Sequence, residues 1–179
     1  MGLSGHYTRR VLLEIPARSL VLLIGASGSG KSTFARKHFR PTQVISSDYC
    51  RALVSDDEND QGVSKDAFEI LHLIAGKRLR LGRFTVIDAT NVQPEARRSL
   101  LALAVEYEVP AGAIVFDMPV DHCLRQNQSR GRRLVDEEII RMQAANLRAS
   151  LGGLREEGFA WIHMLRTAEE TRHAAVSVG

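Results

Sequence analysis

The chain of 179 residues has little of what marks secreted or membrane proteins. It contains only two cysteines, Cys50 and Cys123, so we expect two thiols in a reducing compartment and no disulfide framework. No apolar run reaches the ~18 residues that a membrane span needs, and residues 1–7 lack the basic and apolar layout of a signal peptide. These absences predict a cytoplasmic protein with no membrane segment.

The sequence also lacks a strong excess of charge, because 24 lysine and arginine residues nearly balance 21 aspartate and glutamate residues, for a net charge of +3. Only four of the basic residues are lysine. The arginine excess suits phosphate binding, since the planar guanidinium grips phosphate with two hydrogen bonds, but it also follows from genomic base composition. No repeat or linker is present, and the length predicts a single domain over residues 1–179.

The most informative segment is the glycine-rich loop GASGSGKS at residues 25–32, which follows an aliphatic run at 20–24. A G-x4-G-K-S loop between a strand and a helix is typical of a P-loop that binds ATP or GTP. Its backbone N–H groups point at the β-phosphate, while Lys31 reaches the β- and γ-phosphate oxygens and Ser32 ligates Mg²⁺. The predicted nucleotide-binding residues are Gly25, Ser27, Gly28, Ser29, Gly30, Lys31, Ser32 and Thr33.

Short aliphatic runs alternate with helical patterns along the chain. We expect strands at 11–16, 19–24, 43–46, 83–88, 113–116 and 161–165, and helices at 31–39, 64–81, 94–105, 120–130 and 136–151. This alternation predicts an α/β fold of the P-loop NTPase type, with a doubly wound, mostly parallel sheet and helices on both faces. The first two strands start this sheet and the strand at 161–165 ends it. In such folds ligands bind at the carboxyl ends of the strands.

Two carboxylates fall at such strand ends. Asp48 lies one strand away from the P-loop and can accept the proton of an acceptor hydroxyl, or can cap a short helix. Arg51, one helical turn further, can contact an anion on the acceptor or only pair with Asp48 on the surface. Asp88 is placed like a Walker B carboxylate in the Mg²⁺ shell, or as a helix cap. Thr90 and Asn91, in the next turn, are candidate acceptor contacts.

A basic segment separates the last two long helices. Arg130, Arg132 and Arg133 predict a lid at about 126–136 that closes over the nucleotide and stabilises charge on its phosphates, although any single one can be an idle surface residue. The acidic run at 56–60 lacks the ligand spacing of an EF-hand, so we interpret it as a solvated loop.

Four stretches carry a family resemblance beyond the P-loop fold. They are residues 25–33, SSDYCRALVSDDEN at 46–59, IDATN at 87–91 and NQSRGRRLV at 127–135. Together they resemble the kinase domain of bacterial polynucleotide kinase-phosphatase, an RNA repair enzyme, over almost the whole chain. The P-loop is generic, but the Ser-Ser-Asp-x-Cys-Arg stretch with its acidic extension is specific. Where the family has Arg-Asn at the start of the lid, this chain has Gln126-Asn127.

The resemblance implies transfer of the γ-phosphoryl group of ATP, with Mg²⁺, to the 5′-hydroxyl end of single-stranded RNA or DNA. It makes Asp48 the general base and makes Arg51 the ligand of the phosphate beside the terminal nucleoside. It also implies that Gln61 seats the acceptor strand, while Arg130 and Arg133 act from the lid on the nucleotide. The family fuses this kinase to phosphatase and adenylyltransferase domains, for which 179 residues leave no room.

Two other functions fit the same motifs. A small-metabolite kinase of the gluconate or shikimate type shares the P-loop, the sheet and a lid. A nucleotide-binding switch that hydrolyses slowly and binds a partner needs the P-loop but neither Asp48 nor Arg51.

Overall fold

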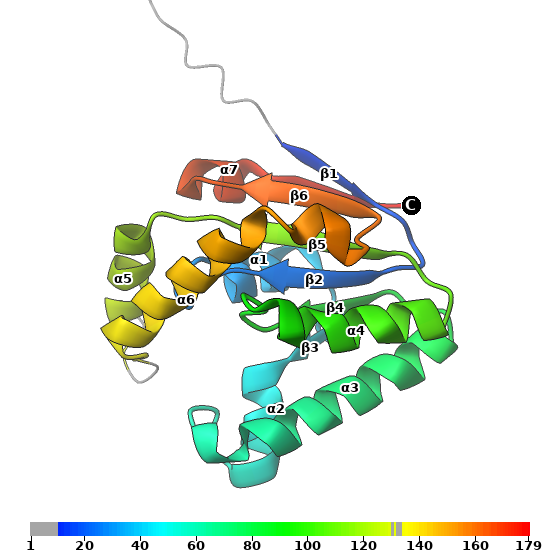
Figure 1. The fold of residues 1–179 in the computed structure, drawn as a ribbon, viewed down its shortest axis with the longest axis horizontal. Helices are drawn as coiled ribbons and strands as arrows, with labels where there is room; N and C mark the ends of the chain where they lie inside the picture. Colours follow the sequence, from blue (N-terminus) through cyan, green and yellow to red (C-terminus); the bar gives the residue numbers. More distant parts are fainter. Residues whose placement is uncertain (1–10, 130, 132–133) are drawn as a thin grey trace, which may run out of the picture.

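The computed structural model describes residues 11–129, 131 and 134–179 and shows an α/β fold with the expected alternation of strands and helices (Figure 1). The predicted strands are all present, and a further one, β7, follows them. Their bounds are β1 Leu12–Ile15, β2 Leu20–Ile24, β3 Val44–Ser46, β4 Thr85–Asp88, β5 Ala111–Phe116, β6 Trp161–Leu165 and β7 Ala175–Val178.

The central sheet has five parallel strands in the order β3-β4-β2-β5-β6. The P-loop strand β2 therefore lies in the middle, beside β4 and β5, and all five residues of β2 are buried. Parallel strands place their carboxyl ends at one edge, so the P-loop, Asp88 at the end of β4 and Asp48 after β3 meet there. This order confirms the doubly wound sheet and inserts β4 between the strands that carry the P-loop and Asp48.

Helices cover both faces of this sheet, as expected. Alternate residues of β2 point to opposite faces: Leu22 packs with α3 and α4, whereas Leu23 packs with α1 and α5. The helix α6 contributes to both clusters, through Leu147 on one side and Ile140 on the other. The α-helices are α1 Lys31–His38, α2 Ser47–Ser55, α3 Ser64–Arg80, α4 Pro94–Glu106, α5 Val120–Gln128, α6 Glu137–Leu151 and α7 Ala168–His173.

The first strand does not belong to the central sheet, contrary to the expectation. β1 pairs in parallel with β7 in a separate two-stranded sheet, and β7 was missed because the polar helix α7 and the short AVSV run give weak signals. Leu13 and Ile15 of β1 are buried in the core between this pair and α1. Of the described residues, no helix is long and apolar enough to cross a membrane.

Candidate nucleotide and acceptor site

The loop between β2 and α1 has the backbone that its glycines predict. Gly28 and Gly30 have φ values of +81° and +100°, which side-chain-bearing residues rarely adopt. At Gly28 a Cβ atom would also lie 2.2 Å from the carbonyl oxygen of Cys123, because α5 packs directly on the loop. Glycine is therefore required at this position for conformation and for space.

Lys31 is buried at the start of α1 and is held by the loop itself. Its Nζ atom donates hydrogen bonds of 2.8 Å to the carbonyl oxygens of Gly25 and Ala26. A buried ammonium group needs such acceptors, since burial of an unpaired charge is costly. The lysine thus sits inside the loop, where the phosphates of a nucleotide would compete for it.

Ser32 and Asp88 form the part of the site suited to Mg²⁺. Asp88 ends β4, is buried, and accepts a hydrogen bond from the Ser32 side chain. Burial raises the pKa of the Asp88 carboxyl above its usual value, with nearby Asp48 adding to the increase and Lys31 opposing it. Hydroxyl and carboxylate oxygens are hard donors of the kind that Mg²⁺ prefers when it is shared with nucleotide phosphates. These two residues fit the metal that the P-loop implies.

Asp48 does not cap a helix; it lies in the first turn of α2, and Ser46 is the cap. The Ser46 side chain accepts a hydrogen bond from the backbone N–H of Tyr49. Asp88 is not a cap either, because Gln93 occupies the cap position of the following helix α4. Both aspartates are therefore available for chemistry at the sheet edge.

Asp48 and Arg51 form an ion pair of 2.6 Å between Oδ1 and Nη1. The pair lies in a cavity wall: the Arg51 side chain is only 11% exposed, whereas Asp48 is 42% exposed. Ser64, at the start of α3, accepts a second hydrogen bond of 3.2 Å from Arg51 Nε. Arg51 is thus fixed in direction, and Asp48 is the more exposed member of the pair.

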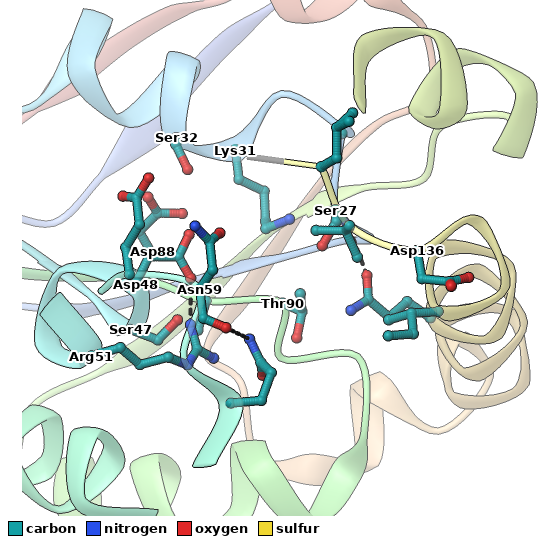
Figure 2. Close-up of a pocket in the computed structure, with 18 of the residues that line it drawn as sticks. Ser27, Lys31, Ser32, Ser47, Asp48, Arg51, Asn59, Asp88, Thr90 and Asp136 are labelled. Carbon is teal, nitrogen blue, oxygen red and sulfur yellow. Dashed lines mark hydrogen bonds and ion pairs between the residues drawn. The ribbon is translucent and has the colours of Figure 1, made fainter. Parts of the chain in front are cut away.

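A cavity of about 350 Å³ joins these groups. Figure 2 shows Ser32, Asp48 and Asp88 grouped on one side of Lys31, with Asp136, the N-cap residue of α6, across the cavity. The predicted residues Gln61 and Thr90 also line it, as do Ser27 and Gly28. Its wall includes ten residues that sequence reasoning did not select as site residues: Ser47, Glu58, Asn59, Phe68, Ala89, Leu134, Val135, Asp136, Ile139 and Gln143.

Five of the described residues that were predicted as contacts do not line the cavity: Gly25, Ser29, Gly30, Thr33 and Asn91. Asn91 is buried with φ +49°, and its Nδ2 donates to the carbonyl oxygen of Leu23 at 2.8 Å, so its amide supports the end of β2. Arg97, also buried, holds the Asn91 carbonyl at 2.7 Å and pairs with Glu157. Thr33 is exposed in the first turn of α1. The Asn91 side chain thus links the segment after β4 to β2, the strand that precedes the P-loop.

The lid arginines Arg130, Arg132 and Arg133 lie outside the described residues, but the base of the lid is described. Asn127 is buried in α5 and exchanges two hydrogen bonds with the backbone of Val135: Nδ2 donates at 2.8 Å and Oδ1 accepts at 3.0 Å. Asn127, which the family pattern shares, therefore ties the two ends of the lid together. Gln126, where the family has arginine, is exposed.

A family model described as an AAA domain matches residues 20–152, which include the P-loop, Asp48, Asp88 and the lid. The chain belongs to this AAA domain family, AAA_33. The matched residues cover strands β2 to β5 and helices α1 to α6, but not β1, β6, α7 or β7. The AAA domain described here has the fold of a P-loop kinase, and that fold implies nucleotide binding.

Known proteins share parts of this AAA domain. "Transcription factor bHLH140" of Arabidopsis thaliana is 31% identical over 112 residues, which are 62% of this chain and 11% of that protein. A chain of the Pnkp1/Rnl/Hen1 RNA repair complex has a TM-score of 0.67 at 23% identity, over 79% of this chain and 47% of that one. A gluconokinase from Sinorhizobium meliloti 1021 has a TM-score of 0.55 at 15% identity, over 88% and 90%. The chain thus spans less than half of the first two proteins.

The residues that sequence reasoning missed left weak signals. Asn59 lies within the acidic run at 56–60 that was interpreted as a solvated loop. Asp57 Oδ1 accepts a 2.9 Å hydrogen bond from the Asn59 backbone N–H, and Asn59 lines the cavity. Gln143 belongs to none of the sequence motifs. Its spacing of seven residues from Asp136, the predicted start of the helix, was the available sign that both share one face.

Proposed function

We propose that this AAA domain transfers the γ-phosphoryl group of ATP to the 5′-hydroxyl end of single-stranded RNA or DNA. The observation that carries the proposal is the Asp48–Arg51 pair in the wall of the cavity that also holds Lys31 and Ser32. A carboxylate and a guanidinium side by side match an acceptor with a hydroxyl group next to a phosphate. The 5′ end of a polynucleotide has both.

In this mechanism the P-loop holds the donor and α2 orients the acceptor. Lys31 leaves the loop carbonyls for the β- and γ-phosphate oxygens. Ser32 and Asp88 would hold Mg²⁺, which would neutralise charge on the phosphates. Asp48 accepts the proton of the 5′-hydroxyl as it attacks the γ-phosphorus. Arg51 binds the phosphate that follows the first nucleoside, and Gln61 and Thr90 line the path of the strand.

The proposed setting is nucleic-acid repair in the cytoplasm. Its support is the fold likeness to a chain of an RNA repair complex, together with the specific Ser-Ser-Asp-x-Cys-Arg stretch at 46–51. The chain spans 47% of that protein.

A second candidate, a small-metabolite kinase, is favoured by a different observation. The gluconokinase matches over 90% of its own length, so a kinase of this size and fold can act on a sugar acid. The cavity of about 350 Å³ is also within the range of small-ligand sites, roughly 300–1,000 Å³. In that case Arg51 would face the carboxylate of the acid.

An acceptor panel separates the two functions. The protein is incubated with Mg²⁺ and γ-labelled ATP, and with a 5′-hydroxyl oligoribonucleotide, the matching oligodeoxyribonucleotide, the same strands already phosphorylated at the 5′ end, gluconate and shikimate. The proposal expects label on the 5′-hydroxyl strands only. Label on gluconate or shikimate, with none on the strands, would replace it by the second candidate.

A further inference from the structure

Gln143 is a cavity residue with no role in the mechanism above. It lines the cavity together with Ile139, four residues earlier in α6, and with Asp136, the N-cap residue of this helix. Ile139 and Gln143 are one turn apart and share one side of the helix, whereas the Asp136 side chain accepts a hydrogen bond from the Glu138 backbone N–H. Gln143 is therefore the polar residue of α6 that lines the cavity.

The side-chain amide of Gln143 has a fixed orientation. Its Oε1 atom accepts a hydrogen bond of 2.8 Å from the backbone N–H of Ser27, the third residue of the P-loop. The amide group is planar, so the hydrogen bond that fixes Oε1 also fixes the direction of Nε2. Among the described residues none accepts a hydrogen bond from Nε2, so the amide presents two N–H donors toward the cavity.

The helix behind Gln143 is anchored. Ile140, Ala144 and Leu147 pack into the core on the neighbouring face of α6. At its far end the Ser150 hydroxyl donates 3.1 Å to the carbonyl oxygen of Val92, in the segment between β4 and α4. These contacts fix the rotation of α6 about its axis. The orientation of Gln143 toward the loop therefore depends on the position of the helix as well as on the side-chain rotamer.

We propose that Gln143 Nε2 donates a hydrogen bond to the terminal phosphoryl group of the bound nucleoside triphosphate. The loop amides that follow Ser27 surround the inner phosphates, so the terminal phosphate extends across the same cavity toward Asp48. Ser27 and Gln143 line this cavity together, so the Gln143 amide borders the space that the terminal phosphate enters. The inference rests on the donor half of the proposed function, the binding of ATP, and is independent of the acceptor.

This contact would make the site sense the third phosphate. A hydrogen bond from a neutral donor to a phosphate oxygen is charge-assisted and stronger than a neutral pair. ADP lacks the group that receives it, so the contact contributes to ATP affinity and not to ADP affinity. During transfer the same donor holds the moving phosphoryl group in line with Asp48.

The test compares ATP and ADP affinities of Gln143→Glu with those of the wild type, by calorimetric titration in the presence of Mg²⁺. The new carboxylate can still accept the Ser27 N–H but cannot donate, so ATP binding should weaken about tenfold or more while ADP binding changes by about twofold or less. The control Gln93→Glu is the same substitution at an exposed position outside the cavity and should change neither value. An unchanged ATP to ADP affinity ratio in Gln143→Glu would overturn the proposal.

The variant Gln143→Ala tests the alternative that Gln143 only blocks the Ser27 N–H in the absence of nucleotide. If Gln143 only occupies the Ser27 N–H until nucleotide arrives, removing it frees that donor and ATP should bind more tightly, which contradicts the proposal. The proposal expects weaker ATP binding here as well, with ADP binding retained. Because both titrations need no acceptor, they can succeed even if the acceptor panel rejects the polynucleotide, and the two failures remain distinct.

Discussion

The two walls of the cavity are built on different principles. The donor wall is backbone: Gly28 and Gly30 set the course of the P-loop, and even Lys31 is held by main-chain carbonyls. The acceptor wall is side chain: Asp48 and Arg51 face the cavity from one helix, supported by Ser64. A backbone wall recognises any polyphosphate, whereas a side-chain wall can select one acceptor. Substitutions on the two walls should therefore fail in different ways.

The largest effect is expected on the donor wall. Lys31→Ala removes the cation that reaches the β- and γ-phosphate oxygens, so transfer should fall by about 10³-fold or more with every acceptor. The measurement is the initial rate of label transfer to the best acceptor of the panel and to water. Lys65→Ala, which removes an exposed lysine of α3, is the control. Near-normal transfer by Lys31→Ala would mean that the P-loop does not hold the donor.

An intermediate and acceptor-selective effect is expected on the other wall. Arg51→Ala removes a charge-assisted contact, so transfer to a strand or to a nucleoside 3′-phosphate should fall about ten- to a hundredfold. Transfer to the bare nucleoside should fall much less, and the affinity for ATP should stay the same. Arg51→Lys keeps the charge but loses the fork that also binds Ser64 Oγ. Equal losses on both acceptors would remove the phosphate contact from the account.

The smallest effect concerns stability and its dependence on pH. Burial raises the pKa of Asp88, so the folded protein holds a proton there at pH values where the unfolded chain has lost it. Stability without nucleotide should therefore fall as pH rises from the ordinary Asp value of 3.8 through the raised value. Asp88→Asn removes the buried charge and should flatten this part of the profile.

Thermal unfolding of wild type and Asp88→Asn across this pH window measures the difference. At neutral pH the variant should melt a few degrees higher without ligand, yet gain less from Mg²⁺ and ATP, because it lacks a carboxylate for the metal shell. If the melting temperatures of the two proteins changed in parallel with pH, burial of the Asp88 carboxylate would not lower stability, contrary to this prediction.

The sequence predicted the donor wall better than the acceptor wall because the donor wall is built from one short stretch of backbone. The conformation of the P-loop requires glycine at positive φ, and these glycines stand at a fixed spacing from Lys31. Both features are local, so the loop from Gly25 to Ser32 could be recognised in the sequence itself. Gln143 reaches the loop from 116 residues away, and only tertiary packing brings it there. The burial of Asn91 likewise depends on Leu23 in another strand.

The edges of the fold show the same limit. β1 was predicted as a strand from its apolar residues, but its partner β7 could not be, because pairing between residues near the two ends of the chain depends on where the sheet ends. The Asp48 cap alternative failed because Ser46, two residues earlier, competes for the same N–H groups.

The central claim is that the Asp48 carboxylate accepts the proton of the acceptor hydroxyl while the P-loop holds ATP. The most direct measurement is Asp48→Ala, with label transfer to the 5′-hydroxyl oligonucleotide and ATP affinity determined on the same protein. The account predicts transfer reduced by about 10²- to 10⁴-fold with ATP affinity unchanged. Transfer at the wild-type rate in this variant would contradict it.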